Sequence, residues 1–394
     1  MLTEQEQAVC DIVASKADAL LEDLKLHVGT PTGGGNLNAI ELSRSMLTTR
    51  LDALGATTTL TNGQPKPAWL GDSDERPRSS VSCRRRDAMT SVLIAGHLDT
   101  VHDPKGPFQK LDINPDGKTA IGPGCVDMKG GLVIAVAALE ALEQAGVDCS
   151  WSFFLNGDEE TGTYHSQQAL RDACDGHAFG LALEPALAGG ELAIERVGSG
   201  QFLVEIEGKA AHVGRAFTEG ISAVTKLGEV LVEIGKMPRP ERGMVANVGP
   251  LVGGQAANAV PDFASGFGNV RFPDLAAADE LAGLLEALET EGDALPRVRI
   301  HKSFNRPAKP EIPATRALAE RARDAAEALG QKLPFAKTGG VCDGNIMQDA
   351  GLPTIDTLGV RGGGLHTPDE WIELASLVER SQLLAVLVMR LGQQ

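Results

Sequence analysis

Hydrophobic positions in the first half of the chain follow the periods of both helices and strands. Apolar residues recur at helical spacing over Glu4–Leu26 and Ala39–Leu54, and shorter apolar runs predict strands. The next predicted elements are a strand at Ser80–Arg86, a strand at Ser91–Ala95, a helix at Lys129–Gln144, and strands at Trp151–Leu155 and Leu181–Leu183. This alternation predicts an α/β domain with a mostly parallel central sheet and helices on both faces.

The pattern changes after residue 200. The order becomes strand, helix, strand, strand, helix, strand, which is that of a ferredoxin-like βαββαβ unit. Its predicted elements are Gln201–Glu207, Ile221–Gly235, Gly243–Pro250, Phe263–Phe272, Ala276–Thr290 and Val298–Phe304. The α/β alternation then resumes with Ala314–Leu329, Pro334–Lys337, Thr354–Leu358 and Ile372–Leu391. We therefore expect an inserted domain at 197–307 that divides an outer domain into 1–196 and 308–394.

Composition narrows the class of protein. The 394 residues carry 53 acidic against 36 basic side chains, and the net charge of −17 argues against affinity for nucleic acid or anionic membranes. No apolar run approaches the ~20 residues that span a bilayer, and the polar start does not resemble a signal peptide. Six cysteines lie scattered without a CxxC pair, as is typical of free thiols in a reducing compartment. We predict a cytoplasmic globular protein.

The first candidates for chemistry follow the apolar run Ser91–Ala95. His97 and Asp99 are two positions apart, so in an extended chain their side chains point to the same side. Ligands bind at the carboxyl ends of strands in open α/β sheets, and a carboxylate beside a histidine fixes the tautomer that a metal requires. Taken alone, the pair is equally consistent with a strand-end histidine that has a satisfied hydrogen bond.

Two later segments offer carboxylates in similar positions. Asp127 lies in the glycine-rich turn GPGCVDMKGG, which lacks phosphate-loop spacing; it could bridge two cations or cap the next helix. Glu159 and Glu160 belong to an acidic run after Trp151–Leu155, which is either a surface turn or a cation site. Neither segment alone decides between its alternatives.

The complete set of residues favours a metal site. Glu184 ends another apolar strand, and His366 lies in the glycine-rich loop GGGLHTPDE. Mixed imidazole and carboxylate ligands suit two divalent metal ions, with Zn2+ as the first choice and Co2+ or Mn2+ as alternatives.

Six motifs together resemble one known family. GHLDT, GPGxxDMKGG, DEETG, LEP, GKAAH and GGGLHTPDE are similar, in this order and over nearly the whole chain, to the metallopeptidase family of acetylornithine deacetylase, succinyl-diaminopimelate desuccinylase and bacterial glutamate carboxypeptidase. GHLDTV, PFxxL and GGxxDGN resemble the glutamate carboxypeptidase branch most. The resemblance implies hydrolysis of an amide or peptide bond adjacent to an amino-acid carboxylate, by a hydroxide that bridges two metals. The substrate would be a small N-acyl amino acid or peptide.

The resemblance also implies which residues hold the metals. One ion would be held by His97, Asp127 and Glu184, and the other by Asp127, Glu160 and His366. Asp127 would thus be shared, and a cis peptide bond would follow it.

Further roles are implied in the same way. Glu159 would be the general base and Asp99 the partner of His97. The inserted domain would mediate homodimerisation and act as a lid, and its His212 would stabilise the oxyanion in the partner subunit's site. The residues implied in substrate binding are the carboxylate contacts Asn258 and Arg306 and the pocket-lining Gly339 and Gly340.

Two alternatives to a metal-dependent hydrolase stay open. Cys125 and Cys342 stand where the family mostly has other residues, and a cysteine hydrolase using Cys125 with His97 is conceivable. It would leave the carboxylates unexplained. The second alternative is a non-catalytic relative that binds a metal or an amino acid as a sensor or scaffold. The intact Glu159 argues against it, because a pure binder needs no such carboxylate.

Overall fold

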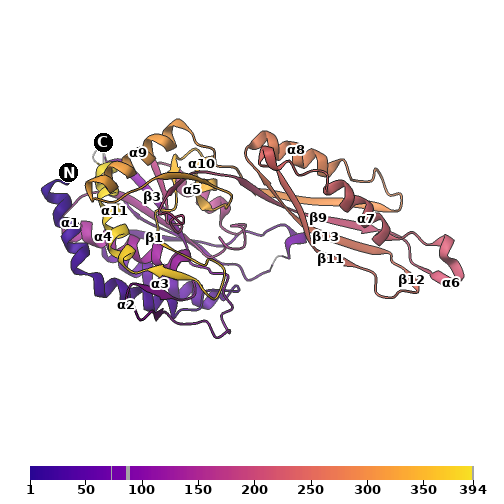
Figure 1. Ribbon diagram of the computed structural model, residues 1–394, viewed down its shortest axis with the longest axis horizontal. Coiled ribbons are helices and arrows are strands. Elements are labelled where there is room, and N and C mark those ends of the chain that lie inside the picture. Colours follow the sequence, from indigo (N-terminus) through magenta and orange to yellow (C-terminus); the bar gives the residue numbers. More distant parts are fainter. Residues whose placement is uncertain (72, 86–88, 393–394) are drawn as a thin grey trace.

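The chain forms two units along one long axis (Figure 1). The computed structural model describes residues 1–71, 73–85 and 89–392. The larger unit contains both terminal parts of the chain, and the segment 198–306 projects from it. Each unit has its own buried core, around Trp151 and Phe153 in the larger and around Phe202 and Phe272 in the smaller. This confirms an insertion, whereas the division at 196/197 and 307/308 stays a prediction.

A mixed sheet of six strands forms the centre of the larger unit. Four adjacent strands, β6, β3, β7 and β16, run parallel, and β2 and β1 extend the sheet with antiparallel pairing. In sheet order the bounds are β1 Thr57–Thr61, β2 Ser79–Arg84, β6 Ser150–Asn156, β3 Ser91–His97, β7 Phe179–Ala182 and β16 Thr354–Ile355. The mostly parallel sheet is thus confirmed, although β1 was not predicted and Arg86 lies outside the described residues.

Helices cover both faces of this sheet because its strands are apolar on both sides. On β3, Val92 and Ile94 pack in one core with helices α1, α3, α4 and α11, whereas Leu93 and Ala95 pack in another with α5 and α10. The helix bounds are α1 Glu4–Ser15, α2 Ala17–Val28, α3 Leu37–Ala53, α4 Gly130–Gln144, α5 Gln167–Cys174, α9 Pro313–Ala328, α10 Asp343–Asp349 and α11 Ala375–Gly392. No helix of the described residues is long and apolar enough to cross a bilayer.

Small sheets complete the larger unit. One pairs β8 with β15, and the other has the order β17-β18-β5-β4. Their bounds are β8 Leu192–Arg196, β15 Phe335–Thr338, β17 Gly362–Gly363, β18 Trp371–Glu373, β5 Thr119–Ile121 and β4 Asp112–Ile113. The β17–β18 hairpin carries the loop that contains His366.

The smaller unit has the predicted βαββαβ order. Its antiparallel sheet runs β11-β13-β9-β14, and helices α7 and α8 cover one face. Phe202, Val204 and Ile206 alternate along β9 and point into this core. The bounds are β9 Gly198–Glu207, α7 Ala223–Ile234, β11 Val245–Gly253, β13 Phe263–Phe272, α8 Leu275–Glu286 and β14 Arg297–Arg306. A short pair, β10 (Ala211–His212) and β12 (Ala259–Val260), lies with α6 (Val213–Ala216) at the far tip (Figure 1).

Candidate metal centre

Three parallel strands bring predicted ligands to one edge of the central sheet. His97 is the last residue of β3, Glu160 lies just after β6, and Glu184 lies just after β7. Strand β3 lies between β6 and β7 and pairs with both in parallel, so these three segments leave the sheet side by side. The position of the ligands therefore follows from the order of the strands.

Asp127 lies between two histidines, with one carboxylate oxygen toward each. Its Oδ1 is 3.2 Å from His97 Nε2, and its Oδ2 is 3.6 Å from His366 Nε2. His366 Nε2 also lies 3.3 Å from a carboxylate oxygen of Glu160. Ligand atoms of His97, Asp127 and Glu160 all lie within 4.8 Å of one another. This arrangement suits a carboxylate that is shared by two metal ions.

The turn that carries Asp127 depends on glycine at two points. Gly124 has a φ of +67°, in the left-handed region that glycine adopts without strain. Gly131 lies in the first turn of α4, where a Cβ would come within 2.5 Å of the carbonyl oxygen of Leu183. The missing side chain lets α4 approach the strand end that carries Glu184. The Asp127–Met128 peptide bond is cis, as the resemblance implies.

Glu370, for which the sequence pattern predicts no role, holds the backbone of this turn. Its buried carboxylate accepts hydrogen bonds from the N–H groups of Gly124 at 2.8 Å, Val126 at 2.9 Å and Asp127 at 3.0 Å. His102 Nε2 lies 2.6 Å from the same carboxylate. The only sequence signal for Glu370 was its place at the end of the HTPDE motif, because its partners lie far away in the chain.

Asp99 contacts His97 through its backbone. His97 Nδ1 is 2.9 Å from the Asp99 carbonyl oxygen and 3.6 Å from its carboxylate. With Nδ1 as the donor to that carbonyl, Nε2 is left as the ligand atom. The Asp99 carboxylate instead accepts from the N–H groups of Glu159 at 3.2 Å and Glu160 at 2.9 Å. Asp99 thus orients His97 and also holds the predicted base and its neighbour.

Burial and like charges shift the protonation of the cluster. Burial raises the pKa of Asp99 to about 8. The charge of His97 opposes this increase, whereas nearby carboxylates add to it. Burial also raises the pKa of Glu184 well above its usual range. Hydrogen bonds to Asp127 and Glu160 raise the pKa of His366 to about 10. Divalent cations would offset this concentration of negative charge, so the imidazole and carboxylate donors fit such ions.

Glu159 is paired with Arg306, the last residue of β14. Arg306 Nη2 lies 2.9 Å from Glu159 Oε1 and donates to the Glu159 carbonyl at 2.9 Å. Arg306 Nη1 lies 3.4 Å from Asp343. The guanidinium is buried, with 3% of Arg306 exposed. The predicted substrate contact therefore lies next to the predicted base and already has two carboxylates as partners.

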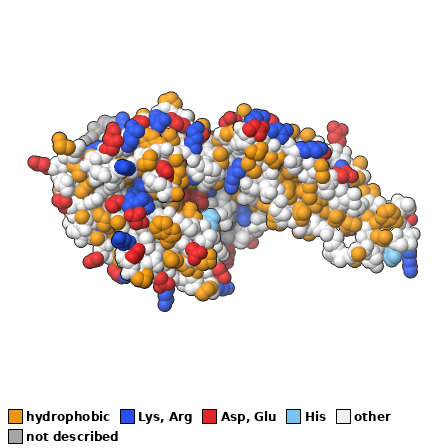
Figure 2. Space-filling view, in the orientation of Figure 1, with side chains coloured by type: hydrophobic (Ala, Val, Ile, Leu, Met, Phe, Trp, Pro, Cys, Tyr) orange, Lys and Arg blue, Asp and Glu red, His pale blue; other side chains and the backbone are white. Residues whose placement is uncertain are grey.

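A cavity of about 370 Å³ opens beside the ligands. Its lining includes Asp127, Glu159, Glu184, Gly340 and His366. Gly340 belongs to the predicted pocket loop, and its carbonyl accepts from Arg196 Nη1 at 3.1 Å. Gly339, its exposed neighbour, is not among the lining residues. A histidine and acidic side chains are visible at the hollow between the two units (Figure 2).

His212 and Asn258 lie far from the ligands of their own chain. His212 ends β10 and precedes α6, and the Val213 N–H donates to the Asn258 carbonyl at 3.0 Å. Both residues are exposed at the tip of the smaller unit (Figure 1). Asn258 and Arg306 were expected on one substrate carboxylate, but they lie at opposite ends of this unit. Within one chain they cannot converge, because the length of the sheet separates them.

Cys125 is unsuited to act as a nucleophile. Its buried thiol donates to the Glu370 carbonyl at 3.6 Å, and burial raises its pKa. A cysteine hydrolase needs the thiolate, which this environment disfavours.

Comparisons with known proteins agree with the fold and identify the family. Residues 93–390 match the family described as Peptidase family M20/M25/M40. The chain is 26% identical to carboxypeptidase G2 of Pseudomonas sp. (strain RS-16), over 99% of this chain and 93% of that protein. It is 30% identical to succinyl-diaminopimelate desuccinylase of Methylorubrum extorquens (strain PA1), over 73% of this chain and 79% of that protein. A tripeptidase structure from Staphylococcus aureus has a TM-score of 0.77 at 21% identity, covering 96% of this chain and 99% of that one.

Proposed function

The chain belongs to peptidase family M20/M25/M40, and we propose that this metal-dependent hydrolase cleaves an amide or peptide bond adjacent to an amino-acid carboxylate. Its substrates would be N-acyl amino acids or small peptides. One observation carries the proposal. Asp127 faces two histidines with separate oxygens, and Glu159, an acid without a ligand role, lies beside the adjoining cavity.

Two divalent ions fit the donor set, and zinc is the first choice on chemical grounds. His97, Asp127 and Glu184 would hold one ion, and Asp127, Glu160 and His366 the other. Zinc accepts mixed imidazole and carboxylate ligands and leaves positions open for water, and cobalt or manganese would also fit. When bound, the ions supply Lewis-acid activation of a water molecule and of the scissile carbonyl.

The side chains of the protein supply the proton transfers. Glu159 accepts a proton from the attacking water and returns it to the departing amine. Asp99 keeps Glu159 and Glu160 in position through their backbone N–H groups. His212 of the partner subunit donates a hydrogen bond to the developing oxyanion.

Recognition of the substrate carboxylate falls to Arg306 and the loop at Gly339 and Gly340. Arg306 Nε and Nη1 find no hydrogen-bond acceptor among the described residues, although Nη1 lies near Asp343. A substrate carboxylate would accept from one of these N–H groups in a charge-assisted hydrogen bond. Asn258 would add a contact from the partner subunit, because it lies beside His212.

We propose a homodimer formed through the inserted unit, residues 197–307, which would also act as the lid. Strand β11 is an edge of the sheet, and its Leu251 and Val252 are 56% and 61% exposed. Val232 on the neighbouring α7 is 60% exposed. Apolar side chains spread over this unit in Figure 2. An open strand edge with an apolar surface is a site for pairing with a second copy. The six cysteines, all free, support the proposed cytoplasmic location.

A substrate panel tests the function. Purified protein is assayed on N-acyl amino acids and on peptides with free or amidated carboxyl ends, with and without a chelator, and its metal content is measured. We expect chelator-sensitive turnover that requires the free carboxylate. Turnover of amidated and free substrates at equal rates would contradict the carboxylate role. Metal binding without turnover of any substrate would favour the non-catalytic alternative.

A further inference from the structure

The smaller unit joins the larger one through two linkers that lie side by side, at Val197 and Pro307. The Arg196 N–H donates to the Lys309 carbonyl at 2.9 Å, and the Lys309 N–H donates back to Arg196 at 2.9 Å. The fully buried carboxylate of Asp356 lies 2.7 Å from Arg196 Nη2 and 3.2 Å from Lys309 Nζ. The linkers are therefore tied to each other and to the end of β16.

Asn345 in α10 binds both linkers at once. It is fully buried, and its Nδ2 donates to the carbonyls of Val197 at 2.9 Å and Pro307 at 2.8 Å. Its Oδ1 accepts from the Cys342 N–H at 3.1 Å. The two donated bonds and the accepted bond are all consistent with one orientation of the side-chain amide. One side chain thus holds the points at which the chain enters and leaves the smaller unit.

Asp343, at the start of the same helix, connects this junction to Glu159. Its carboxylate lies 3.4 Å from Arg306 and accepts from Thr163 Oγ1 at 2.7 Å and from Asn156 Nδ2 at 2.7 Å. Arg306 directly precedes the second linker and contacts the Glu159 carboxylate at 2.9 Å. A change in the path of that linker would therefore move the guanidinium that orients Glu159.

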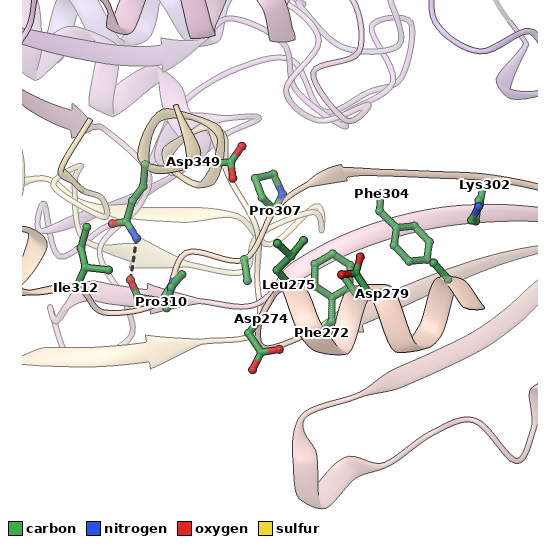
Figure 3. A pocket seen from close by; sticks show the side chains of 14 residues that line it. Phe272, Asp274, Leu275, Asp279, Lys302, Phe304, Pro307, Pro310, Ile312 and Asp349 are labelled. Atoms are coloured by element: carbon green, nitrogen blue, oxygen red, sulfur yellow. Dashed lines mark hydrogen bonds between the residues drawn. The ribbon is translucent and has the colours of Figure 1, made fainter. Parts of the chain in front are cut away.

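The two units are not closely packed against each other beside the linkers. A cavity of about 710 Å³ lies between α8 and the end of α10 (Figure 3). The stacked rings of Phe272 and Phe304 line one side, and Asp349 lines another. Gln348 also lines the cavity and donates a hydrogen bond of 2.7 Å to the Pro310 carbonyl, drawn as the dashed line in Figure 3. The two units are therefore not closely packed at this cavity. The hydrogen bonds from α10 to the linkers must then fix much of the orientation of the smaller unit.

We propose that Asn345 is a positioning residue for the hydrolysis. By fixing Val197 and Pro307 it holds Arg306 against Glu159 and so sets the orientation of the base. The inference rests on the proposed role of Glu159, and it assigns to the GGxxDGN segment a role in coupling the two units.

The test compares two buried amides of the same helix. Asn345→Ala removes both bonds to the linkers, whereas Gln348→Ala removes a bond to Pro310 and one from Thr315 without touching Val197 or Pro307. We expect kcat to fall on the order of 10-fold to 100-fold for Asn345→Ala, because a misplaced catalytic group has an effect of this size. KM should rise as well, because Arg306 is also the proposed substrate contact, whereas the metal content should change little. Gln348→Ala should lose thermal stability but keep kcat.

Hydrogen exchange separates positioning from a loss of stability. Amides of 159–163 and 305–309 should exchange faster in Asn345→Ala than in Gln348→Ala, at temperatures equally far below each Tm. Equal kcat and equal exchange in the two variants would overturn the proposal.

A second variant keeps the test decisive if Asn345→Ala fails to fold. Asp343→Asn preserves the shape of the side chain but removes the charge that faces Arg306, and kcat should again fall. An unchanged kcat would contradict the coupling. If the unmodified protein turned over no substrate, the proposed function would fail, whereas the exchange comparison would still show whether Asn345 holds the junction.

Discussion

The metal centre of the larger unit and the tip of the smaller unit hold their functional candidates in opposite surroundings. In the centre, His97 and Asp99 are buried, and the backbone of Asp127 is fixed by Glu370. At the tip, His212 and Asn258 are exposed, and the hydrogen bond to the His212 ring comes from the nearby Gly214 N–H at 3.1 Å. The metal centre is organised by contacts within a single chain. The tip instead exposes hydrogen-bonding side chains that are available to another molecule.

This difference shows what each region needs for its proposed role. The proposed ligands converge because parallel strand ends share one edge of the sheet, so their arrangement needs no second chain. Among the residues described, His212 has no ion-pair partner at the tip. Its role is meaningful only if another subunit brings its metal centre to it. Variants of the two regions should therefore behave differently when subunits are mixed.

The largest expected effect belongs to the centre. Glu159→Gln preserves the size of the side chain but removes the base, and kcat should fall by about 10²- to 10⁴-fold. Metal content should stay the same, because Glu159 is not a proposed ligand. Steady-state kinetics with metal analysis checks both results. A variant that loses metal together with activity would assign Glu159 to the ligands instead.

The next effect belongs to the tip. His212→Ala should lower kcat on the order of 10²-fold, since removing one oxyanion donor has an effect of that order. Mixing it with Glu159→Gln should restore activity, because a mixed dimer has one site with both groups intact. In a 1:1 mixture about half the dimers are mixed, so about a quarter of the full activity should return.

Two controls accompany the mixing experiment. Light scattering confirms that dimers form, and Val252→Lys on the exposed edge of β11 should weaken them and abolish the rescue. Full activity of a monomeric Val252→Lys variant would show that His212 has no role across subunits.

A third prediction concerns stability, and it also separates the units. His27 of α2 is buried, and burial lowers its pKa to about 4. The unfolded chain binds this proton near pH 6.5, so between pH 6.5 and 4 the unfolded state holds more protons. The free energy of unfolding should thus decrease as the pH falls through this window, by about 3 kcal/mol at most.

Urea unfolding at several pH values measures this dependence, and His27→Gln should reduce it. Hydrogen exchange should show that α2 loses protection at acidic pH before β9 of the smaller unit does. If the slope were the same in His27→Gln, another group would be responsible.

Much of the fold could be predicted from the sequence because it depends on local patterns. Apolar runs predicted the strands that end at His97 and Asn156, and the change of element order after residue 200 predicted the insertion. Short elements such as β1, a polar strand of five residues rich in threonine, gave no such signal. Its partner β2 supplies the pairing that the sequence pattern of β1 does not indicate.

The site was less predictable where it depends on distant contacts. His366 has a φ of +63° and an exposed side chain in a loop, and no local pattern distinguishes it from an ordinary loop histidine. Arg306 was expected to face a substrate, but a sequence does not show that Glu159 and Asp343 share its guanidinium. Asn345 acts on linkers that lie far from it in the chain, so its role follows from the structure alone.

The smallest expected effect tests whether the organisation of the centre depends on Glu370. One carboxylate oxygen accepts from Val126 and Asp127, and the other accepts from Gly124 and lies next to His102. In Glu370→Gln an NH2 group replaces one of these oxygens, so either Gly124 or both Val126 and Asp127 lose their acceptor, whichever way the amide turns.

We expect the affinity for Zn2+ or Co2+ to fall about 10- to 100-fold, as it does when groups that hold metal ligands are removed. Titration of the metal-free protein measures it. Glu373→Gln is the matched control, because Glu373 pairs with Arg361 and makes no contact with the turn of Asp127. Unchanged affinity in Glu370→Gln would mean that the turn keeps its shape without this carboxylate. The shape of the metal centre would then depend less on residues distant in the chain than its hydrogen bonds indicate. In this respect it would resemble the tip, where the contact to His212 is local.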